Sequence, residues 1–344
     1  MAKKKAAVAV DGSLFDNLHL LANKTIGDKD NPDVKYWLST GITLLDAALG
    51  NGIPGGKLTV IKGPYQKGKT LLALAICKQA QNLGGACVWL DAEARFSSTL
   101  RKLCGVSDDP SHWFYRIPNS LEMTLDFIEK AAEKAVSSES PTIIVLDSIA
   151  SIGSKAGGKD DRGIDEKGYI APKKAAKFAE FFERGILRDI AGSNVYLVFT
   201  NQIRDSLDFH SHGPKQHSSP GGHAIDHNVT VMLKMGMKQL EKQDKKGVKR
   251  TIGSWLTVTT EKNAGPCYRK VEFPFYYRYG LDDNLSILNY LISCGAMPKR
   301  KEIYYELDEV LKTKAAWREL LSEDPDTLHK FKEYLRSIYL ELEG

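Results

Sequence analysis

The chain has 344 residues, of which 42% are hydrophobic and 26% are charged, and its formal net charge is +5 at pH 7. These values are ordinary for a globular protein with a full hydrophobic core, and the modest charge does not by itself indicate a nucleic-acid partner. No apolar run is long enough to cross a membrane, and the first ten residues, MAKKKAAVAV, lack the apolar core and cleavage site of a signal peptide. The five cysteines are scattered without a C-x-x-C pair, which argues against a disulfide framework and a zinc site. We therefore expect a cytoplasmic protein with no membrane partner.

The first predicted element is a helix in SLFDNLHLLANKT, residues 13–25. Leu14, Phe15, Leu18 and Leu21 form an apolar stripe at helical spacing. An isolated amphipathic helix is unstable without a surface to cover, so the stripe predicts docking on the rest of this chain or on a neighbouring molecule. A polar, Asp-rich connector follows this helix.

Strands and helices are predicted to alternate through the middle of the chain. Apolar, β-branched runs predict strands at 57–63, 86–93, 142–148, 194–202, 229–235 and 254–262. Helical patterns separate the first four runs, at 70–83, 121–137 and 173–192. This alternation is typical of βαβ units with a mainly parallel sheet, whereas the later strands, which turns connect, predict antiparallel additions. After about residue 284 we expect helices, at 286–295, 302–313 and 326–343.

The stretch GPYQKGKT, residues 63–70, lies between a predicted strand and a predicted helix. G-x-x-x-x-G-K-T lets the backbone wrap around an anion, because glycine tolerates unusual dihedral angles and adds no side chain. We expect Lys69 to reach the β and γ phosphates of ATP and the Thr70 hydroxyl to bind Mg²⁺. The strand before the motif and the helix after it favour this site over a Gly/Lys turn without a ligand. The predicted nucleotide-binding residues of this loop are Gly63, Pro64, Tyr65, Gln66, Lys67, Gly68, Lys69, Thr70 and Leu71.

Two carboxylates at the ends of strands are expected to complete this site. Asp147 closes an apolar strand in TIIVLDS, and we expect it on the metal side of the nucleotide, with helix capping as the alternative role. Glu93 ends VWLDAE, where a carboxylate can orient the water that attacks the γ-phosphate. Asp91 competes for that role but lies deeper in the strand, and a surface salt bridge is the alternative reading of Glu93.

With these motifs in place, the chain resembles the RecA family of recombinases over roughly residues 38–342. The matching segments are, in chain order, STGITLLDAALGNGIPGGKLTVIKGPYQKGKT, VWLDAEARF, IIVLDSIASI, VYLVFTNQIR, SSPGGHAI, TTEKNAGPCYRKVEFPFYYRYGLD and AAWRELLSEDPDTLHKFKEYLRSI. The divergent N-terminus and unusual loops favour a phage version. The resemblance implies an α/β fold with a polymerisation arm and linker at 1–37, a RecA-like P-loop ATPase core at 38–284 and a small α-rich domain at 285–344.

The resemblance also implies roles for residues outside the phosphate loop. Gln202 ends the strand that senses the γ-phosphate, a task that suits a neutral amide. Lys262 matches one of two lysines that reach the ATP of the neighbouring subunit, and Thr260 stands at the position of the other. The position of the adenine-stacking tyrosine aligns with Leu100, which leaves Leu100 and Phe96 as alternatives for that contact.

The resemblance places two DNA-binding loops, at 155–178 and 203–222. The implied DNA-binding residues are Lys177, Arg184, Arg204, Gly221 and Gly222, with Lys173 and Lys174 as additional candidates. Cations on flexible loops suit recognition that is independent of sequence, because phosphate neutralisation supplies most of the affinity. Five of the eight histidines fall in or beside the second loop, and we favour polar residues that face DNA over a zinc site there.

The resemblance implies a DNA-dependent ATPase that uses ATP and Mg²⁺ in homologous recombination and DNA repair. It would form helical filaments on single-stranded DNA, with ATP at the interface between copies, and promote pairing and strand exchange with double-stranded DNA. A single-strand-binding protein or a loader is a further expected partner, and a phage version would act in the cytoplasm of its bacterial host. The alternatives are a ring-forming helicase motor on the same core and an accessory protein that coats single strands in an ATP-gated manner.

Overall fold

The computed structural model describes residues 34–153, 167–203, 222–243, 247–263, 268–301, 303–308 and 310–343. The chain divides into two compact units, residues 1–33 and residues 34–344, and the predicted N-terminal helix lies outside the described residues. The domain boundaries expected at residues 37 and 284 stay predictions. In the part of the chain that the structure describes, no helix is long and apolar enough to span a membrane.

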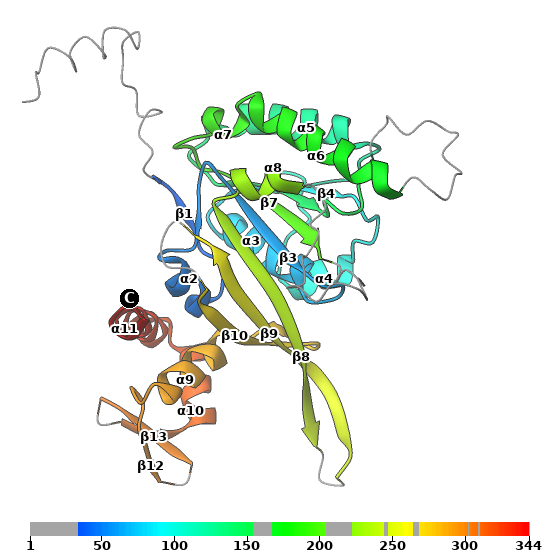
Figure 1. The fold of residues 1–344 in the computed structure, drawn as a ribbon. Coiled ribbons are helices and arrows are strands. Elements are labelled where there is room, and N and C mark those ends of the chain that lie inside the picture. The colour runs from blue at the N-terminus through cyan, green and yellow to red at the C-terminus, as the bar shows by residue number, and fades with distance from the viewer. Residues whose placement is uncertain are drawn as a thin grey trace, which may run out of the picture. The chain divides into compact units, whose positions relative to one another are not determined.

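The described residues form a large sheet of nine strands in the order β11-β10-β9-β8-β3-β7-β6-β4-β5 (Figure 1). Its strands are β3 Lys57–Gly63, β4 Ala86–Asp91, β5 Trp113–Arg116, β6 Thr142–Asp147, β7 Val195–Gln202, β8 Val231–Gln243, β9 Lys249–Lys262, β10 Lys270–Tyr276 and β11 Gly280–Leu281. The neighbouring pairs β5–β4, β4–β6, β6–β7, β7–β3 and β3–β8 are parallel. The pairs β8–β9, β9–β10 and β10–β11 are antiparallel. The predicted α/β fold with a mainly parallel sheet and antiparallel additions is confirmed.

The two faces of this sheet belong to different hydrophobic clusters among the described residues. Ile143 and Val145 of β6 pack in one cluster, and Ile144 and Leu146 pack in the other, because successive side chains of a strand point to opposite faces. The first cluster includes the apolar side of α3 Lys69–Asn82. The second covers the face under α5 Leu121–Ala135, α6 Lys167–Glu183 and α7 Ile186–Asp189, which Figure 1 shows together on one side of the sheet.

The predicted helix at 173–192 is interrupted in the structure. It forms α6 and α7, because Gly185 takes a left-handed conformation with φ of 98° between them. Short elements that we did not predict complete the core: β1 Trp37–Leu38, α2 Thr43–Leu49, β2 Ile53–Pro54, α4 Ser98–Leu103 and α8 Gly222–Asn228. They are too short to show a clear period in the sequence.

The prediction of a helix at 302–313 is wrong. The described residues of that range form β13 Tyr304–Leu307 and β14 Val310–Thr313, which join β12 Lys299–Lys301 in a three-stranded antiparallel sheet. Asp308 takes a left-handed φ of 48° between the two strands and reverses the chain there. The flanking helices are α9 Asp283–Ser293, α10 Lys314–Glu323 and α11 Pro325–Glu343. Trp317, Leu335 and Tyr339 of these helices share the hydrophobic cluster of α2.

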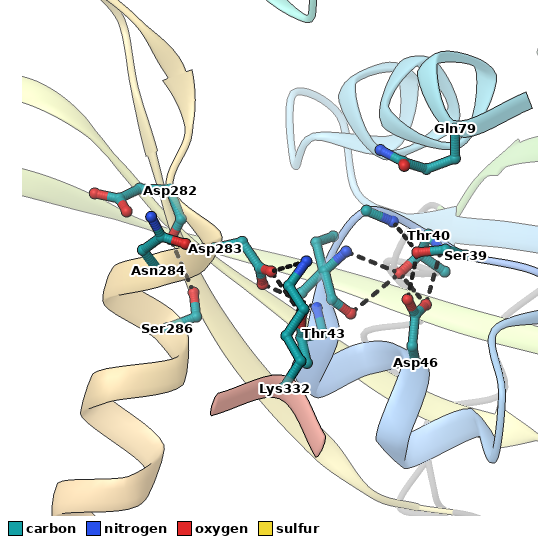
Figure 2. Close-up of polar contacts among 12 residues, drawn as sticks. Ser39, Thr40, Thr43, Asp46, Gln79, Asp282, Asp283, Asn284, Ser286 and Lys332 are labelled. Atoms are coloured by element: carbon teal, nitrogen blue, oxygen red, sulfur yellow. Dashed lines mark hydrogen bonds and ion pairs between the residues drawn. The ribbon is translucent and has the colours of Figure 1, made fainter. Parts of the chain in front are cut away.

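A half-buried carboxylate, Asp283, connects α2 to the C-terminal helices, and a buried one, Asp46, connects α2 to the segment before it (Figure 2). Asp283, at the start of α9, accepts hydrogen bonds from the Thr43 amide at 2.9 Å and the Thr43 hydroxyl at 2.6 Å. Lys332 of α11 places its ammonium 3.7 Å from the same carboxylate. On the next turn of α2, Asp46 accepts hydrogen bonds from the amide and the hydroxyl of Thr40 at 2.8 and 2.7 Å. The Asp283 contacts tie α2, α9 and α11 together, and the Asp46 contacts tie α2 to the segment before it.

The pH dependence of stability tests the burial of Asp46. Burial raises the pKa of Asp46 to about 6, although hydrogen bonds from Ser39 and Thr40 oppose the change. Between pH values of about 4 and about 6 the folded chain therefore binds more protons than the unfolded chain, so Asp46 contributes stability at low pH that is lost as the pH rises through about 6. Asp283, whose pKa burial also raises, acts in the same direction.

We expect Asp46→Asn to remove this contribution. The free energy of unfolding of the parent, measured with urea, should fall between pH 4 and pH 7 by about 2 to 3 kcal/mol more than that of the variant. Asp326→Asn, which changes an exposed residue of α11, is the control and should follow the parent. Equal pH dependence in the parent and in Asp46→Asn would contradict this account.

Candidate nucleotide site

The loop between β3 and α3 wraps closely around a space at the end of the sheet. Gly68 has a left-handed φ of 86°, and a Cβ added there would lie 2.8 Å from Cδ2 of Leu256. A Cβ on Gly63 would lie 2.9 Å from the carbonyl oxygen of Met235 on β8. The left-handed conformation therefore favours glycine at position 68, and the close approach of the β8 backbone requires it at position 63. Because α3 begins at Lys69, its first amide groups have no partner within the helix and are available to an anion bound in the loop.

Lys69, Thr70 and Asp147 lie together at this loop. The Lys69 ammonium donates to the carbonyl oxygens of Gly63 at 3.0 Å and Pro64 at 2.8 Å, so it lies over the loop. The Thr70 hydroxyl donates to Oδ2 of Asp147 at 2.8 Å. Burial lowers the pKa of Lys69, and the nearby carboxylates of Asp147 and Glu93 oppose that change.

Asp147 is a buried carboxylate with hydroxyl partners on both oxygens. Its side chain is 8% exposed, and the Thr200 hydroxyl of β7 donates to its Oδ1 at 2.5 Å while Thr70 occupies Oδ2. Burial raises the pKa of Asp147, hydrogen bonds from Thr200 and Thr70 lower it, and the charges of Glu93 and Asp91 raise it further. A bound cation would favour the ionised form, because opposite charge stabilises a buried carboxylate.

These residues fit a complex of ATP with Mg²⁺. A hydroxyl and a carboxylate are oxygen ligands of the kind that Mg²⁺ prefers, and Lys69 supplies a cation for the phosphates. Within the described ranges, no group of three or more His, Cys, Asp or Glu side chains could hold a metal ion. A metal that takes part of its coordination from phosphate oxygens needs no such group.

Glu93 lies just beyond β4 and is half-buried, at the edge of the cleft that contains Lys69, Thr70 and Asp147. Its Oε1 accepts hydrogen bonds from the Ser148 hydroxyl at 2.9 Å and the Ser151 hydroxyl at 3.2 Å. Asp91, the competing candidate, is 2% exposed and accepts hydrogen bonds from the Glu93 amide and the Tyr115 hydroxyl. Of the two carboxylates, Glu93 is the one with the exposure that contact with a water molecule requires.

One cleft of about 550 Å³ joins the phosphate loop to a largely apolar region. Phe96 and Leu100, the two candidates for contact with the base, both line it. Sequence reasoning missed the remaining wall of this region, which consists of Met237, Ser254, Leu256, Phe275 and Tyr277. Gln202 also lines the cleft, because the register of β3 and β7 sets it directly beside Gly63. The cleft thus has one end lined by Lys69 and Thr70, which suits phosphates, and an apolar, aromatic end that suits a nucleobase.

Comparison with known proteins decides the family. Residues 20–282 match the family described as RecA N-terminal domain. The chain is 30% identical over 300 residues to Protein RecA of Thermus aquaticus, which covers 86% of this chain and 83% of that protein. It is 28% identical over 337 residues to Protein RecA of Pseudomonas savastanoi pv. phaseolicola, which covers 97% of this chain and 90% of that protein. This chain belongs to the RecA family.

Membership in the RecA family confirms the resemblance, the RecA-like fold and the expected function in ATP-dependent recombination and strand exchange. It does not favour the helicase motor or the accessory protein. RecA-family proteins are DNA-dependent ATPases that bind ATP with Mg²⁺ and form filaments on DNA, and the expected enzyme class and cofactors of this chain, with DNA and further copies of itself as partners, agree with that family.

In this RecA-family chain, Lys262 and Thr260 both lie away from the cleft and contact other parts of the protein. Its ammonium donates to the carbonyl oxygens of Asp226 at 3.0 Å and His227 at 3.4 Å, near the C-terminal end of α8. Thr260 is fully buried, and its hydroxyl oxygen accepts the amide of Arg269 at 3.0 Å. Among the described residues that line the cleft of this RecA-family chain, neither Lys262 nor Thr260 is present.

The expected DNA-binding residues of this RecA-family chain fall partly within the structure. Lys177 lies on α6 and Arg184 directly follows that helix, and both form ion pairs with Glu180, at 2.8 and 2.7 Å. Lys174 departs from our expectation: it is 6% exposed, and its ammonium donates to the carbonyl oxygens of Ile149 and Ala150, so it serves the interior and does not face a ligand. Gly222 begins α8, whereas Arg204 and Gly221 lie outside the described residues.

Proposed function

We propose that this RecA-family chain hydrolyses ATP with Mg²⁺ when it is bound to single-stranded DNA. The observation that carries the proposal is the cleft that joins Lys69, Thr70 and Asp147 to Glu93 at one end and to an apolar wall at the other. Lys69 would bind the phosphates, while Thr70 and Asp147 would hold Mg²⁺. When bound, Mg²⁺ would neutralise charge that develops on the phosphate oxygens.

The Glu93 carboxylate would accept a hydrogen bond from the attacking water and align it with the γ-phosphorus. Hydrogen bonds from Ser148 and Ser151 support this role, because they hold one oxygen of the carboxylate in place. Gln202, beside Gly63 at the end of β7, would sense the γ-phosphate and transmit its presence to the loop that follows. Lys262 would act on the nucleotide of a neighbouring copy.

We further propose that the chain polymerises on single-stranded DNA and promotes pairing and strand exchange with double-stranded DNA. The DNA contacts would come from Lys177, Arg184, Arg204, Gly221 and Gly222. A phage-encoded protein would do this in the cytoplasm of its bacterial host, with a single-strand-binding protein or a loader as partner. The rate of phosphate release, measured with and without single-stranded DNA, tests the proposal together with negative-stain images.

Stimulation by DNA together with filaments would support the recombinase. Rings that unwind forked duplex would instead identify a helicase motor, and filaments without DNA-stimulated phosphate release would identify an accessory protein.

Filament formation should depend on the N-terminal arm. We propose that the apolar stripe of residues 13–25 docks on the adjacent copy. Replacing both Phe15 and Leu18 with glutamate should leave a folded monomer, because on this proposal the stripe contributes to a contact between copies, but it should abolish filaments in negative-stain images. Undiminished filaments would reject a docking role for the arm.

A further inference from the structure

The turn after β4, residues 92–97, brings both Glu93 and Phe96 to the cleft. Asp91, the last residue of β4, holds this turn: its Oδ1 accepts the Glu93 amide at 3.2 Å and its Oδ2 accepts the Phe96 amide at 2.9 Å. Between those two amides, Ala94 takes a left-handed φ of 53°. A residue other than glycine keeps such a conformation only where its surroundings hold it. The Asp91 carboxylate therefore determines the path of the turn.

Tyr115 extends this support to the neighbouring strand, β5. Its hydroxyl donates to Oδ2 of Asp91 at 2.9 Å, and its ring lies 5.2 Å from the Phe96 ring, centroid to centroid. Burial and the Asp91 carboxylate raise the pKa of Tyr115 to about 12, so the phenol keeps its proton and remains a donor at neutral pH. Tyr115 thus contacts both the Asp91 carboxylate, which holds the turn, and the Phe96 ring, which belongs to the turn.

The side chain and the main chain of Glu93 are held by different residues. Ser148 and Ser151 hold its carboxylate, whereas Asp91 holds its main-chain amide. A carboxylate that must align a water molecule gains from both supports, because a displacement of about 1 Å can lower a rate by about a hundredfold.

We propose that Asp91 and Tyr115 are positioning residues of the ATPase site, which act by fixing the turn that carries Glu93. The inference rests on the proposed role of Glu93 as the residue that orients water. Asp91 itself is 2% exposed, and its oxygens accept the two amides and the phenol, so it is not placed to activate water. Tyr115 acts through Asp91 and is not among the described residues that line the cleft.

Tyr115→Phe tests the proposal, because it removes the hydroxyl and keeps the ring against Phe96. We expect kcat for ATP hydrolysis to fall about tenfold while KM for ATP stays within about twofold, since Lys69 and Thr70 are untouched. Asp91→Asn should reduce kcat further, because its amide group would face the amides of the turn. Tyr304→Phe is the control: Tyr304 lies on β13 and is 37% exposed, against 39% for Tyr115.

A double variant separates positioning from general destabilisation. In a Glu93→Gln background, Tyr115→Phe should have no further effect on the residual rate, because the group that it positions is already lost. A full tenfold loss in that background, or an unchanged kcat in Tyr115→Phe alone, would overturn the proposal. If Glu93→Gln itself hydrolyses ATP at the parental rate, the role proposed for Glu93 fails instead, and the positioning role that rests on it fails with it.

Discussion

Lys69→Ala is expected to abolish ATP hydrolysis, with a loss of at least about a thousandfold in kcat/KM. Lys69 is the first residue of α3, and its ammonium lies over the loop between the carbonyl oxygens of Gly63 and Pro64. Alanine removes that cation where the phosphates of ATP would carry their highest charge density. The remaining loop amides can still contact an anion, but they carry no full charge with which to stabilise the transferred phosphoryl group.

Phosphate release with saturating single-stranded DNA measures this effect. Lys78→Ala is a matched control, because Lys78 is a half-buried lysine of the same helix and is not among the residues that line the cleft. Thermal melting should show both variants folded. Parental hydrolysis by Lys69→Ala would mean that the loop does not bind the reacting phosphates.

Glu93→Gln is expected to leave ATP binding within a few-fold of the parent while reducing kcat by at least about a hundredfold. The amide keeps the size of the side chain and can still accept the hydrogen bonds from Ser148 and Ser151. It lacks the negative charge and basicity that polarise the attacking water, so the loss should appear in turnover. The variant should therefore accumulate as an ATP complex, and its filaments should persist longer than those of the parent.

Equilibrium binding of a fluorescent ATP analogue and single-turnover hydrolysis separate these two quantities. Glu319→Gln, at an exposed position of α10, controls for the loss of one negative charge. Hydrolysis by Glu93→Gln at the parental rate would show that another group activates the water.

The elements that could be predicted from the sequence are those with a strong local pattern. The continuous apolar runs in 57–63 and 142–147 form β3 and β6 because strands buried on both faces need apolar side chains on both. The end of β8 and the start of β9, which pair with each other, carry exposed polar residues, so the hydrophobic pattern covers only part of each strand. The range 302–313 spaces its apolar residues in a way that suits a helix or a strand, and pairing with β12 resolved that ambiguity.

Some residues of the candidate site could also be predicted from a local pattern, and others could not. Lys69 and Thr70 are recognisable because the phosphate loop is a contiguous motif, and Asp147 and Glu93 because each ends a predicted strand. Tyr277, Met237 and the other residues of the apolar wall carry no motif, since they reach the cleft only through the order of strands in the sheet.

The alternation of strands and helices, the phosphate loop and the strand-end carboxylates could be read from the chain alone, because short-range spacing and hydrophobic period specify local structure. The folded arrangement was needed to show that Tyr115 reaches Asp91, that Lys174 is buried and that Tyr304–Leu307 and Val310–Thr313 are strands. Those outcomes depend on which strands lie side by side and in what register. Contacts between residues far apart in the chain are set by the packing of the whole fold, and no local pattern records them.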